Sequence, residues 1–240
     1  MRSDLINSLQ WGESLKRLAH NAAIDVNDES IALLRQFAAE LLAWNEKTNL
    51  TAITAPAEVA EKHMLDSLIP GKFIQSAFPA GELTLLDIGS GGGFPGIPLK
   101  IFMPEMRVTM VDSVRKKINF LKYAILALKL DGIDAIHARV EDLARQAAFA
   151  GGFDVVISRA FTALDRFVIL AVPFIKPGGI IIAMKGKEIK KELDDLETMA
   201  VGPGIYKIGG HHLSLRFENY TLPDSGGQRS LVILRKTEHF

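Results

Sequence analysis

A glycine-rich segment at residues 87–96 has the composition of a ligand-binding loop, and it reads DIGSGGGFPG. Glycines carry no Cβ, so backbone N–H groups can approach a ligand closely. Gly89, Gly91 and Gly93 match the G-x-G-x-G loop that binds S-adenosylmethionine (SAM), whereas Gly91, Gly93 and Gly96 match the G-x-G-x-x-G loop that binds dinucleotides. The loop alone leaves both cofactors open, and it also fits a tight turn without a ligand.

Two acidic residues near the loop favour SAM. Asp112 ends the second apolar run about 20 residues after the loop, where a carboxylate can accept hydrogen bonds from both ribose hydroxyls, although it could also cap the next helix. Asp87 ends the first apolar run; it suits a cationic sulfonium and would oppose a diphosphate. No tyrosine has a lysine four residues later, so one common hydride-transfer pair is missing. We predict SAM and keep a nicotinamide-dependent oxidoreductase as the alternative.

The sequence lacks the motifs and residue types of several other classes of enzyme and metalloprotein. There is no G-x-x-x-x-G-K-[ST] phosphate loop, since Gly186-Lys187 is followed by Glu188. Ser90 lacks the glycine two residues earlier that a serine-hydrolase elbow needs. The chain has no cysteine, which excludes thiolate zinc sites, iron–sulfur clusters and a cysteine nucleophile. His211-His212 has no partner at metal-ligand spacing, so no metal is predicted.

Apolar runs that alternate with helical patterns must position these residues. The runs lie at residues 83–88, 108–111, 135–138, 154–158 and 179–183. This alternation predicts a doubly wound, mostly parallel α/β sheet. The tail differs: residues 205–215 and 230–235 read as strands of a final antiparallel hairpin.

The first 80 residues read as helical. Asn27 is a capping residue followed by two acids, and apolar residues then recur at helical spacing from Ile31 to Leu42. A second helix is predicted to begin at Pro56 and to stop at Pro70-Gly71. We therefore divide the chain into a helical N-terminal region, 1–80, on the substrate side and a SAM-dependent domain, 81–240.

The net charge of the chain and the length of its apolar stretches limit the classes of partner that it can bind. The 28 basic and 28 acidic side chains balance, which argues against a non-specific polyelectrolyte binder. Residues 1–20 lack the apolar run of a targeting signal, and the longest strongly apolar stretch, 167–175, is too short to cross a bilayer. We expect a monomeric, cytoplasmic protein that does not bind membranes.

Several motifs together resemble one family. They are DIGSGGGFPGIP at 87–98, DS at 112–113, RVE at 139–141, ISRAF at 157–161, MKG at 184–186, WNEKTNLT at 44–51 and KHMLDS at 62–67. These motifs are similar to those of the bacterial 16S ribosomal RNA guanine-N7 methyltransferases, also called glucose-inhibited division protein B. The resemblance spans residues 41–187 and implies a seven-stranded SAM-dependent methyltransferase sheet behind a small helical region. It also implies methyl transfer to a guanosine of 16S rRNA or the small ribosomal subunit.

The resemblance also assigns roles to residues. It implies Gly89 and Phe94 at the cofactor, Val140 and Glu141 beside its adenine, and Arg159 in contact with it. With the loop and the second acid, the predicted cofactor residues are Gly89, Gly91, Gly93, Phe94, Asp112, Val140, Glu141 and Arg159. Arg159 and Lys185 follow strand ends and are candidates for holding the base, and Asn45, His63 and Asp66 are candidates to line the cleft from the helical side.

Methylation of guanine N7 needs no general base, because N7 carries a lone pair and no proton. We therefore predict catalysis by positioning and electrostatics, without a catalytic acid or base. A third possibility is a non-catalytic RNA-binding assembly factor. Basic clusters at 115–117 and at Lys187, Lys190 and Lys191 could contact phosphates, although residues 187–197 alternate in charge as an ordinary exposed helix does. With zero net charge, an RNA enzyme must gather its basic residues around one cleft.

Overall fold

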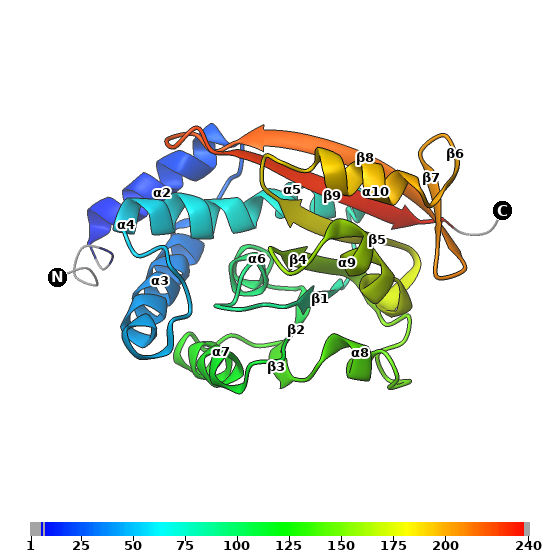
Figure 1. The fold of residues 1–240 in the computed structure, drawn as a ribbon. Helices are drawn as coiled ribbons and strands as arrows, with labels where there is room; N and C mark the ends of the chain where they lie inside the picture. Colours follow the sequence, from blue (N-terminus) through cyan, green and yellow to red (C-terminus); the bar gives the residue numbers. More distant parts are fainter. Residues whose placement is uncertain (1–5, 7, 238–240) are drawn as a thin grey trace.

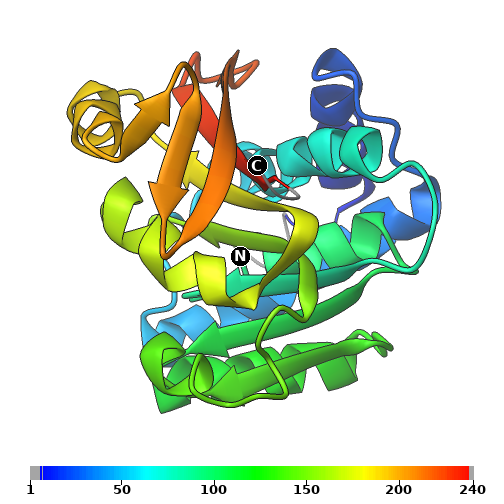
Figure 2. The same ribbon diagram turned by 90° about the vertical axis from the view of Figure 1, so that its right-hand side faces the viewer.

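A central β-sheet organises the computed structural model, which describes residue 6 and residues 8–237 (Figure 1). Its strands are β1 (Thr84–Ile88), β2 (Arg107–Asp112), β3 (Ile133–His137), β4 (Phe153–Arg159), β5 (Ile175–Lys185), β6 (Ala200–Gly202), β7 (Ile205–Ile208), β8 (His211–Thr221) and β9 (Gln228–Lys236). The strand order is β3-β2-β1-β4-β5-β9-β8-β7-β6. Figure 2 shows this order from the green strands at the bottom to the orange strands at the top.

The predicted α/β sheet with a parallel core is confirmed, but the described residues form nine strands where seven were expected. The predicted strand at 205–215 breaks at Gly209 and Gly210, whose φ angles are +57° and +80°, and becomes the β7–β8 hairpin. Strand β6 then pairs with β7. Because β9, β8, β7 and β6 all join antiparallel, only the half from β3 to β5 is parallel.

Helices cover both faces of the sheet, as Figure 1 shows. They are α2 (Leu9–Asn21), α3 (Asp28–Thr48), α4 (Pro56–Glu58), the π-helical η1 (Val59–Leu65), α5 (Asp66–Ala77), α6 (Gly96–Phe102), α7 (Arg115–Ala127), α8 (Val140–Leu143), α9 (Leu164–Ala171), the 3₁₀ turn η2 (Val172–Phe174) and α10 (Lys190–Glu197). Among the described residues, no helix combines the length and apolarity needed to cross a membrane.

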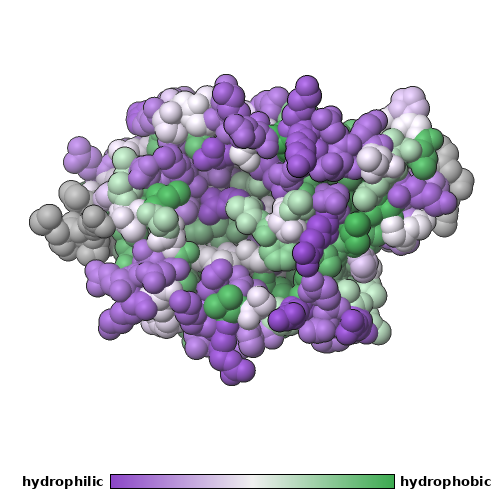
Figure 3. Space-filling view, in the orientation of Figure 1, coloured by the Kyte–Doolittle hydropathy of each residue, from purple (hydrophilic) through white to green (hydrophobic). Residues whose placement is uncertain are grey.

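The face of the molecule seen in Figure 1 is hollowed across its middle. In the space-filling view, pale and green side chains of intermediate or high hydropathy lie in this hollow, and purple, hydrophilic side chains form its upper and lower rims (Figure 3). A concave, partly apolar surface of this kind is where small ligands bind to most globular proteins.

Alternating strand residues build two separate cores. Leu85 and Ile157 face α2, α3, α5, α6 and α7, whereas Leu86 and Val156 face α8, α9 and α10. This follows from the two-residue period of a strand, whose side chains point to opposite faces. Strands β1, β4 and β5 are buried on both faces, which explains their continuous apolar runs, whereas the edge strand β3 is partly exposed.

The helices before β1 match the predicted pattern except at one proline. The side chain of Asn27 accepts a hydrogen bond from Ser30 N at 2.8 Å and so caps α3 as predicted. The predicted stop at Pro70-Gly71 is wrong, because α5 continues to Ala77. Packing against α6 overrides the local preference for a helix end. A Cβ at Gly71 would collide with the ring of Phe102, so the glycine allows α5 and α6 to pack closely.

Candidate active site

The glycine loop is fixed to the neighbouring strand by its backbone. Gly89 N and Ser90 N both donate to the carbonyl oxygen of Val111, at 2.8 and 3.2 Å. Gly89 has φ +72°, a left-handed conformation that favours glycine. The sharp turn after β1 therefore places the loop at the carboxyl ends of β1 and β2, where open α/β sheets bind ligands.

Asp112 connects the loop to the start of α7. Its Oδ2 accepts a hydrogen bond from Gly91 N at 3.0 Å, and its Oδ1 accepts one from Val114 N at 2.8 Å. Nζ of Lys117 lies 3.6 Å from Oδ2. The carboxylate thus organises the loop and caps the helix, and its remaining lone pairs border the adjacent pocket.

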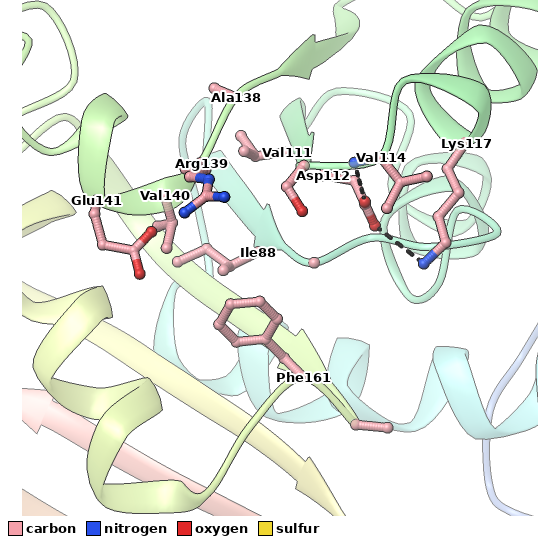
Figure 4. A pocket seen from close by; sticks show the side chains of 13 residues that line it. Ile88, Val111, Asp112, Val114, Lys117, Ala138, Arg139, Val140, Glu141 and Phe161 are labelled. Atoms are coloured by element: carbon pink, nitrogen blue, oxygen red, sulfur yellow. Dashed lines mark hydrogen bonds and ion pairs between the residues drawn. The ribbon is translucent and has the colours of Figure 1, made fainter.

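A pocket of about 350 Å³ opens beside this carboxylate, and we refer to it as the loop pocket (Figure 4). Its lining residues are Ile88, Gly89, Val111, Asp112, Ser113, Val114, Lys117, Ala138, Arg139, Val140, Glu141, Ala160 and Phe161. Lys117 and Arg139 balance Asp112 and Glu141, so the lining has no net charge. Four predicted cofactor residues, Gly89, Asp112, Val140 and Glu141, meet here.

Phe161 lies directly over the loop. A Cβ added at Gly89 would overlap the Phe161 ring, so this close approach requires glycine. The ring is 40% exposed and reaches into the loop pocket, as Figure 4 shows. The residue before it, Ala160, has φ +53°, a strained conformation for a residue with a side chain.

Asp87 is buried beneath the glycine loop. Its Oδ2 accepts a hydrogen bond from Gly96 N at 3.0 Å, while its Oδ1 has no hydrogen-bond partner among the described residues. Burial raises the pKa of this carboxyl group to about 7. A buried carboxylate with an unpartnered oxygen is stabilised by a nearby cation, which makes Asp87 suited to a cationic ligand.

A second pocket of about 330 Å³ lies on the other side of the β4 end, and we call it the cationic pocket. Its lining residues are Ile53, Lys62, His63, Asp66, Arg159, Ala160, Met184, Lys185, Gly186, Tyr220 and Arg229. Four basic side chains outnumber the single carboxylate. The predicted substrate residues His63, Arg159 and Lys185 therefore meet in one cleft.

Arg159 is held by three groups of the helical region. Its Nη1 donates to the carbonyl oxygen of Lys62 at 2.9 Å and lies 3.4 Å from Oδ2 of Asp66. Its Nη2 donates to Nδ1 of His63 at 3.2 Å. The guanidinium also stacks on Phe94, with its carbon 4.7 Å from the ring centre. The strand end and the helical region thus form one rigid wall of the pocket.

His63 is neutral and has a defined tautomer. A guanidinium can only donate, so Nδ1 accepts from Arg159 and the proton sits on Nε2, which donates to Oγ1 of Thr51 at 2.7 Å. Burial, with the positive charge of Arg159, lowers the pKa of His63 to about 3. The ring stacks on Phe94 with centres 4.5 Å apart.

Several predicted residues lie outside both pockets. Phe94 is buried between His63 and Phe37 rather than exposed to a ligand. Asn45 does not line the cleft; its amide exchanges two hydrogen bonds with the backbone of Thr51, at 2.8 and 2.9 Å. Gly91 and Gly93 shape the loop without lining the loop pocket.

Lys185 lines the cationic pocket, but its ammonium is already engaged. Its Nζ donates to the carbonyl oxygen of Thr162 at 2.6 Å and lies 2.7 Å from Oε2 of Glu192. Sequence reasoning missed Tyr220 and Arg229, which come from β8 and β9. The strands predicted at residues 205–215 and 230–235 contain neither residue, because β8 and β9 extend further toward the turn than the sequence pattern indicated.

Comparisons with known proteins agree with this arrangement. Residues 30–205 match the GidB family, described as rRNA small subunit methyltransferase G. The ribosomal RNA small subunit methyltransferase G of Geobacter sp. strain M21 is 42% identical over 224 residues, 92% of this chain and 96% of that protein. The protein of the same name from Brevibacillus brevis is 35% identical over 216 residues, 90% of this chain and 86% of that protein.

Solved structures of methyltransferases share the fold. An O-methyltransferase from Bacillus cereus, solved in complex with SAH, aligns with a TM-score of 0.59 at 16% identity over 92% of this chain and 96% of that one. A SAM-dependent methyltransferase from Aquifex aeolicus aligns with a TM-score of 0.53 at 14% identity over 78% and 97%. With the family match over most of its length, the chain belongs to the GidB family, rRNA small subunit methyltransferase G.

Proposed function

We propose that this protein transfers a methyl group from SAM to N7 of a guanosine in the 16S rRNA of the small ribosomal subunit. The proposal rests mainly on one observation, namely that the two pockets are adjacent and share a lining residue. Ala160 lines both the loop pocket and the cationic pocket. A neutral pocket for the methyl donor therefore adjoins a positively charged pocket for an RNA base.

The loop pocket fits SAM in its chemistry. Gly89 provides a surface without a Cβ, and Asp112 offers acceptor lone pairs to ribose hydroxyls. Val140 and Glu141 line the part of the pocket where the family resemblance expects the adenine. Asp87 does not line the pocket, but it is buried directly beneath the loop, and its unpartnered Oδ1 adds a negative potential that favours a cationic ligand. When bound, SAM supplies an electrophilic methyl group on its sulfonium.

The residues of the cationic pocket orient the acceptor base rather than remove a proton. Both nitrogens of His63 are engaged, by Arg159 and by Thr51, and its low pKa keeps the ring neutral. Arg159 is fixed by Asp66 and Lys62, so it can meet the guanine O6 edge or a phosphate without reorganising. N7 then stays open toward the loop pocket.

The two parts of the chain would divide the work between the two ligands. Residues 1–80 would form the substrate side, because His63 and Asp66 reach the cationic pocket from there, and residues 81–240 the SAM-dependent domain. A monomer would suffice, since one chain lines both pockets. The cytoplasm would be the working compartment, because small ribosomal subunits are made and used there.

Methylation of isolated substrates tests the proposal. Purified protein is incubated with methyl-labelled SAM and small-subunit rRNA, both naked and assembled into subunits, from cells without this enzyme. We expect label in N7-methylguanosine at a single nucleotide. Replacement Asp112→Ala should abolish labelling at limiting SAM. A wild-type protein that binds rRNA but neither binds SAM nor labels any substrate would instead be an assembly factor, and binding of NAD without SAM would indicate an oxidoreductase.

A further inference from the structure

We propose that a groove between α10 and the β8–β9 hairpin binds the RNA strand beside the methylated guanosine, with one neighbouring base on its apolar floor and phosphates at Lys187 and Lys190. This inference rests on the proposed function, because it assigns the groove to the same RNA. The groove has a volume of about 490 Å³, within the range of pockets that hold small molecules or single nucleotides. We call it the flanking groove.

The lining of the flanking groove suits an unstacked nucleotide. Ile189, Leu193 and Phe217 form an apolar, partly aromatic floor. Asn219 and Gln228 add amide groups that can pair with base edges. Proteins recognise single-stranded RNA by this combination, since the π-face of a base stacks on aromatic side chains while its edge forms hydrogen bonds.

The β8–β9 register places the polar groups on the same face of the hairpin. Asn219 pairs with Ser230, and Thr221 pairs with Gln228. The hydroxyl of Ser230 donates to Oδ1 of Asn219 at 2.9 Å, which fixes the amide and leaves its N–H₂ group to donate toward a ligand. A fixed amide loses little conformational entropy on binding, so it can read a base edge.

The charge of the flanking groove selects an anion. Lys187, Lys190 and Arg229 line it, and no acidic residue does among those the structure describes. Lys62 and Lys185 of the cationic pocket are held by Glu58 and Glu192.

Lys187 and Lys190 differ from those two held lysines. Both are exposed, and neither has an ion-pair partner within the described part of the chain. These two ammonium groups are therefore open to phosphates.

The flanking groove is continuous with the cationic pocket. Tyr220 and Arg229 line both, and they lie opposite each other in the β8–β9 ladder. Gly186 lines the cationic pocket and the next residue, Lys187, lines the flanking groove, so the chain passes from one to the other at this point. A strand whose target base occupies the cationic pocket thus passes over Arg229 into the groove, which favours RNA over a protein ligand.

Charge reversal on α10 and the segment before it tests the inference, with a single reversal on the same helix as the control. Lys187→Glu with Lys190→Glu removes the two open cations, whereas Lys191→Glu reverses a neighbouring exposed charge outside the groove. Each full-length protein is assayed for SAM affinity, for binding of a fluorescein-labelled single-stranded RNA, and for kcat and KM on unmethylated small subunits. Thermal melting confirms that each variant is folded.

We expect the double variant to raise the KM for subunits and the Kd for RNA by about tenfold or more. The slope of log Kd against log salt concentration should become shallower by about one for each phosphate that the protein no longer neutralises. Its SAM affinity and kcat should match wild type, and Lys191→Glu should match wild type throughout. Lys191→Glu reverses one charge and the double variant reverses two. If Lys191→Glu raised log Kd by about half as much as the double variant, the effect would be one of general charge and the inference would be overturned. A raised KM for subunits with unchanged RNA binding would assign the groove to a ribosomal protein and also overturn it.

The proposed function can fail separately. If wild type methylates subunits and the double variant behaves like it, only the groove assignment is lost. If wild type labels no substrate, the proposed function is lost, while the RNA-binding comparison between the double variant and Lys191→Glu still tests the groove.

Discussion

The hydroxyl of Tyr220 donates a 2.7 Å hydrogen bond to Oδ1 of Asp66, which joins the C-terminal hairpin to the first residue of α5. The other oxygen of this carboxylate faces Arg159 at 3.4 Å, and Nε of Arg229 lies 3.7 Å from Oδ1. Desolvation and the Asp66 charge both raise the pKa of Tyr220 above its ordinary value, so the phenol stays protonated as a donor. One buried carboxylate therefore holds three segments of the chain around the cationic pocket.

Replacing Asp66 by asparagine should loosen that pocket. The neutral amide would leave Arg159 buried without its counter-ion, and removal of one partner of a buried pair costs about 3 kcal/mol of unfolding free energy. We expect this loss in urea denaturation and a raised KM for rRNA. The SAM affinity should be unchanged, because Asp66 does not line the loop pocket.

A milder variant separates the ion pair from the hydrogen bond. Tyr220→Phe removes the donor to Asp66 but keeps Arg159 paired, so it should cost about 1–2 kcal/mol. If Asp66→Asn were no more destabilising than Tyr220→Phe, the ion pair would not be what organises this pocket.

His63 should make the stability of the protein depend on pH on the acidic side. Its pKa is about 3 in the folded protein and about 6.5 in the unfolded chain. Between these values the unfolded chain binds a proton that the folded protein does not. The free energy of unfolding therefore rises with pH across this window, by up to about 1.4 kcal/mol per unit, and His63 adds no further change above it.

Urea denaturation from about pH 4 to pH 7 measures this slope. His63→Gln removes the titrating ring and should flatten the profile, although the variant will be less stable at neutral pH because stacking on Phe94 is lost. An equally steep profile in His63→Gln would assign the pH dependence to other groups. Activity near neutral pH should show no ionisation of His63, because its pKa lies far below that range.

Local sequence patterns predicted the turn and the strand ends that border the loop pocket, although Gly91, Gly93 and Phe94 do not line it. The loop glycines, Asp112 and the apolar strands are each defined by neighbours within a few residues, and the loop pocket contains Gly89 and Asp112 as the spacing indicates. Backbone hydrogen bonding to Val111 is a direct consequence of adjacent parallel strands. Such features depend on short-range rules, so a sequence without relatives still predicts them.

The cationic pocket depends on contacts that sequence spacing cannot reveal. Tyr220 meets Asp66 across 154 positions of the chain, because the hairpin extends past β5 to the helical region. Asn45 illustrates the same limit: its motif predicts importance, but only the fold shows that it braces Thr51, which in turn holds His63. Residues that act through another residue are identified by packing, not by pattern.

The buried carboxylate of Asp87 should lower the free energy of unfolding of the ligand-free protein and raise its affinity for SAM. Its pKa of about 7 lies above the unfolded value of about 4, so the folded protein binds the extra proton between these values. The free energy of unfolding therefore falls as pH rises through this window, and the penalty is complete above about pH 7. Asp87→Asn should stabilise the ligand-free protein at about pH 8, by roughly 1–2 kcal/mol, because no buried charge remains.

The same variant should bind SAM at least about tenfold more weakly, because the cationic ligand loses its buried counter-charge. Calorimetry with SAM and thermal melting without it measure the two effects on one preparation. Tight SAM binding by Asp87→Asn would show that the unpartnered Oδ1 does not face the ligand. Asp154→Asn is a suitable control, because Asp154 contacts Lys176 and Thr84, the first residue of β1, and so lies at the opposite end of that strand from the glycine loop.

The contact between Gly89 and Phe161 can be measured by a double-mutant cycle. Gly89→Ala forces a residue with a Cβ into φ +72° and into the Phe161 ring, so both strain and overlap should weaken SAM binding and lower stability by about 2 kcal/mol or more. Gly91→Ala meets only the backbone strain, since its Cβ would touch nothing closer than the Gly89 carbonyl oxygen at 3.9 Å.

Combining Gly89→Ala with Phe161→Ala removes the overlap and leaves the strain. We therefore expect the double variant to recover stability to the level of Gly91→Ala, with a coupling energy of about 1 kcal/mol between the two sites. If the Phe161 ring, rather than the turn at Gly89, limits access to the loop pocket, the double variant should also bind SAM more tightly than Gly89→Ala does. Additive effects of the two substitutions, measured by denaturation and calorimetry, would show that Phe161 moves aside freely and does not restrict the pocket.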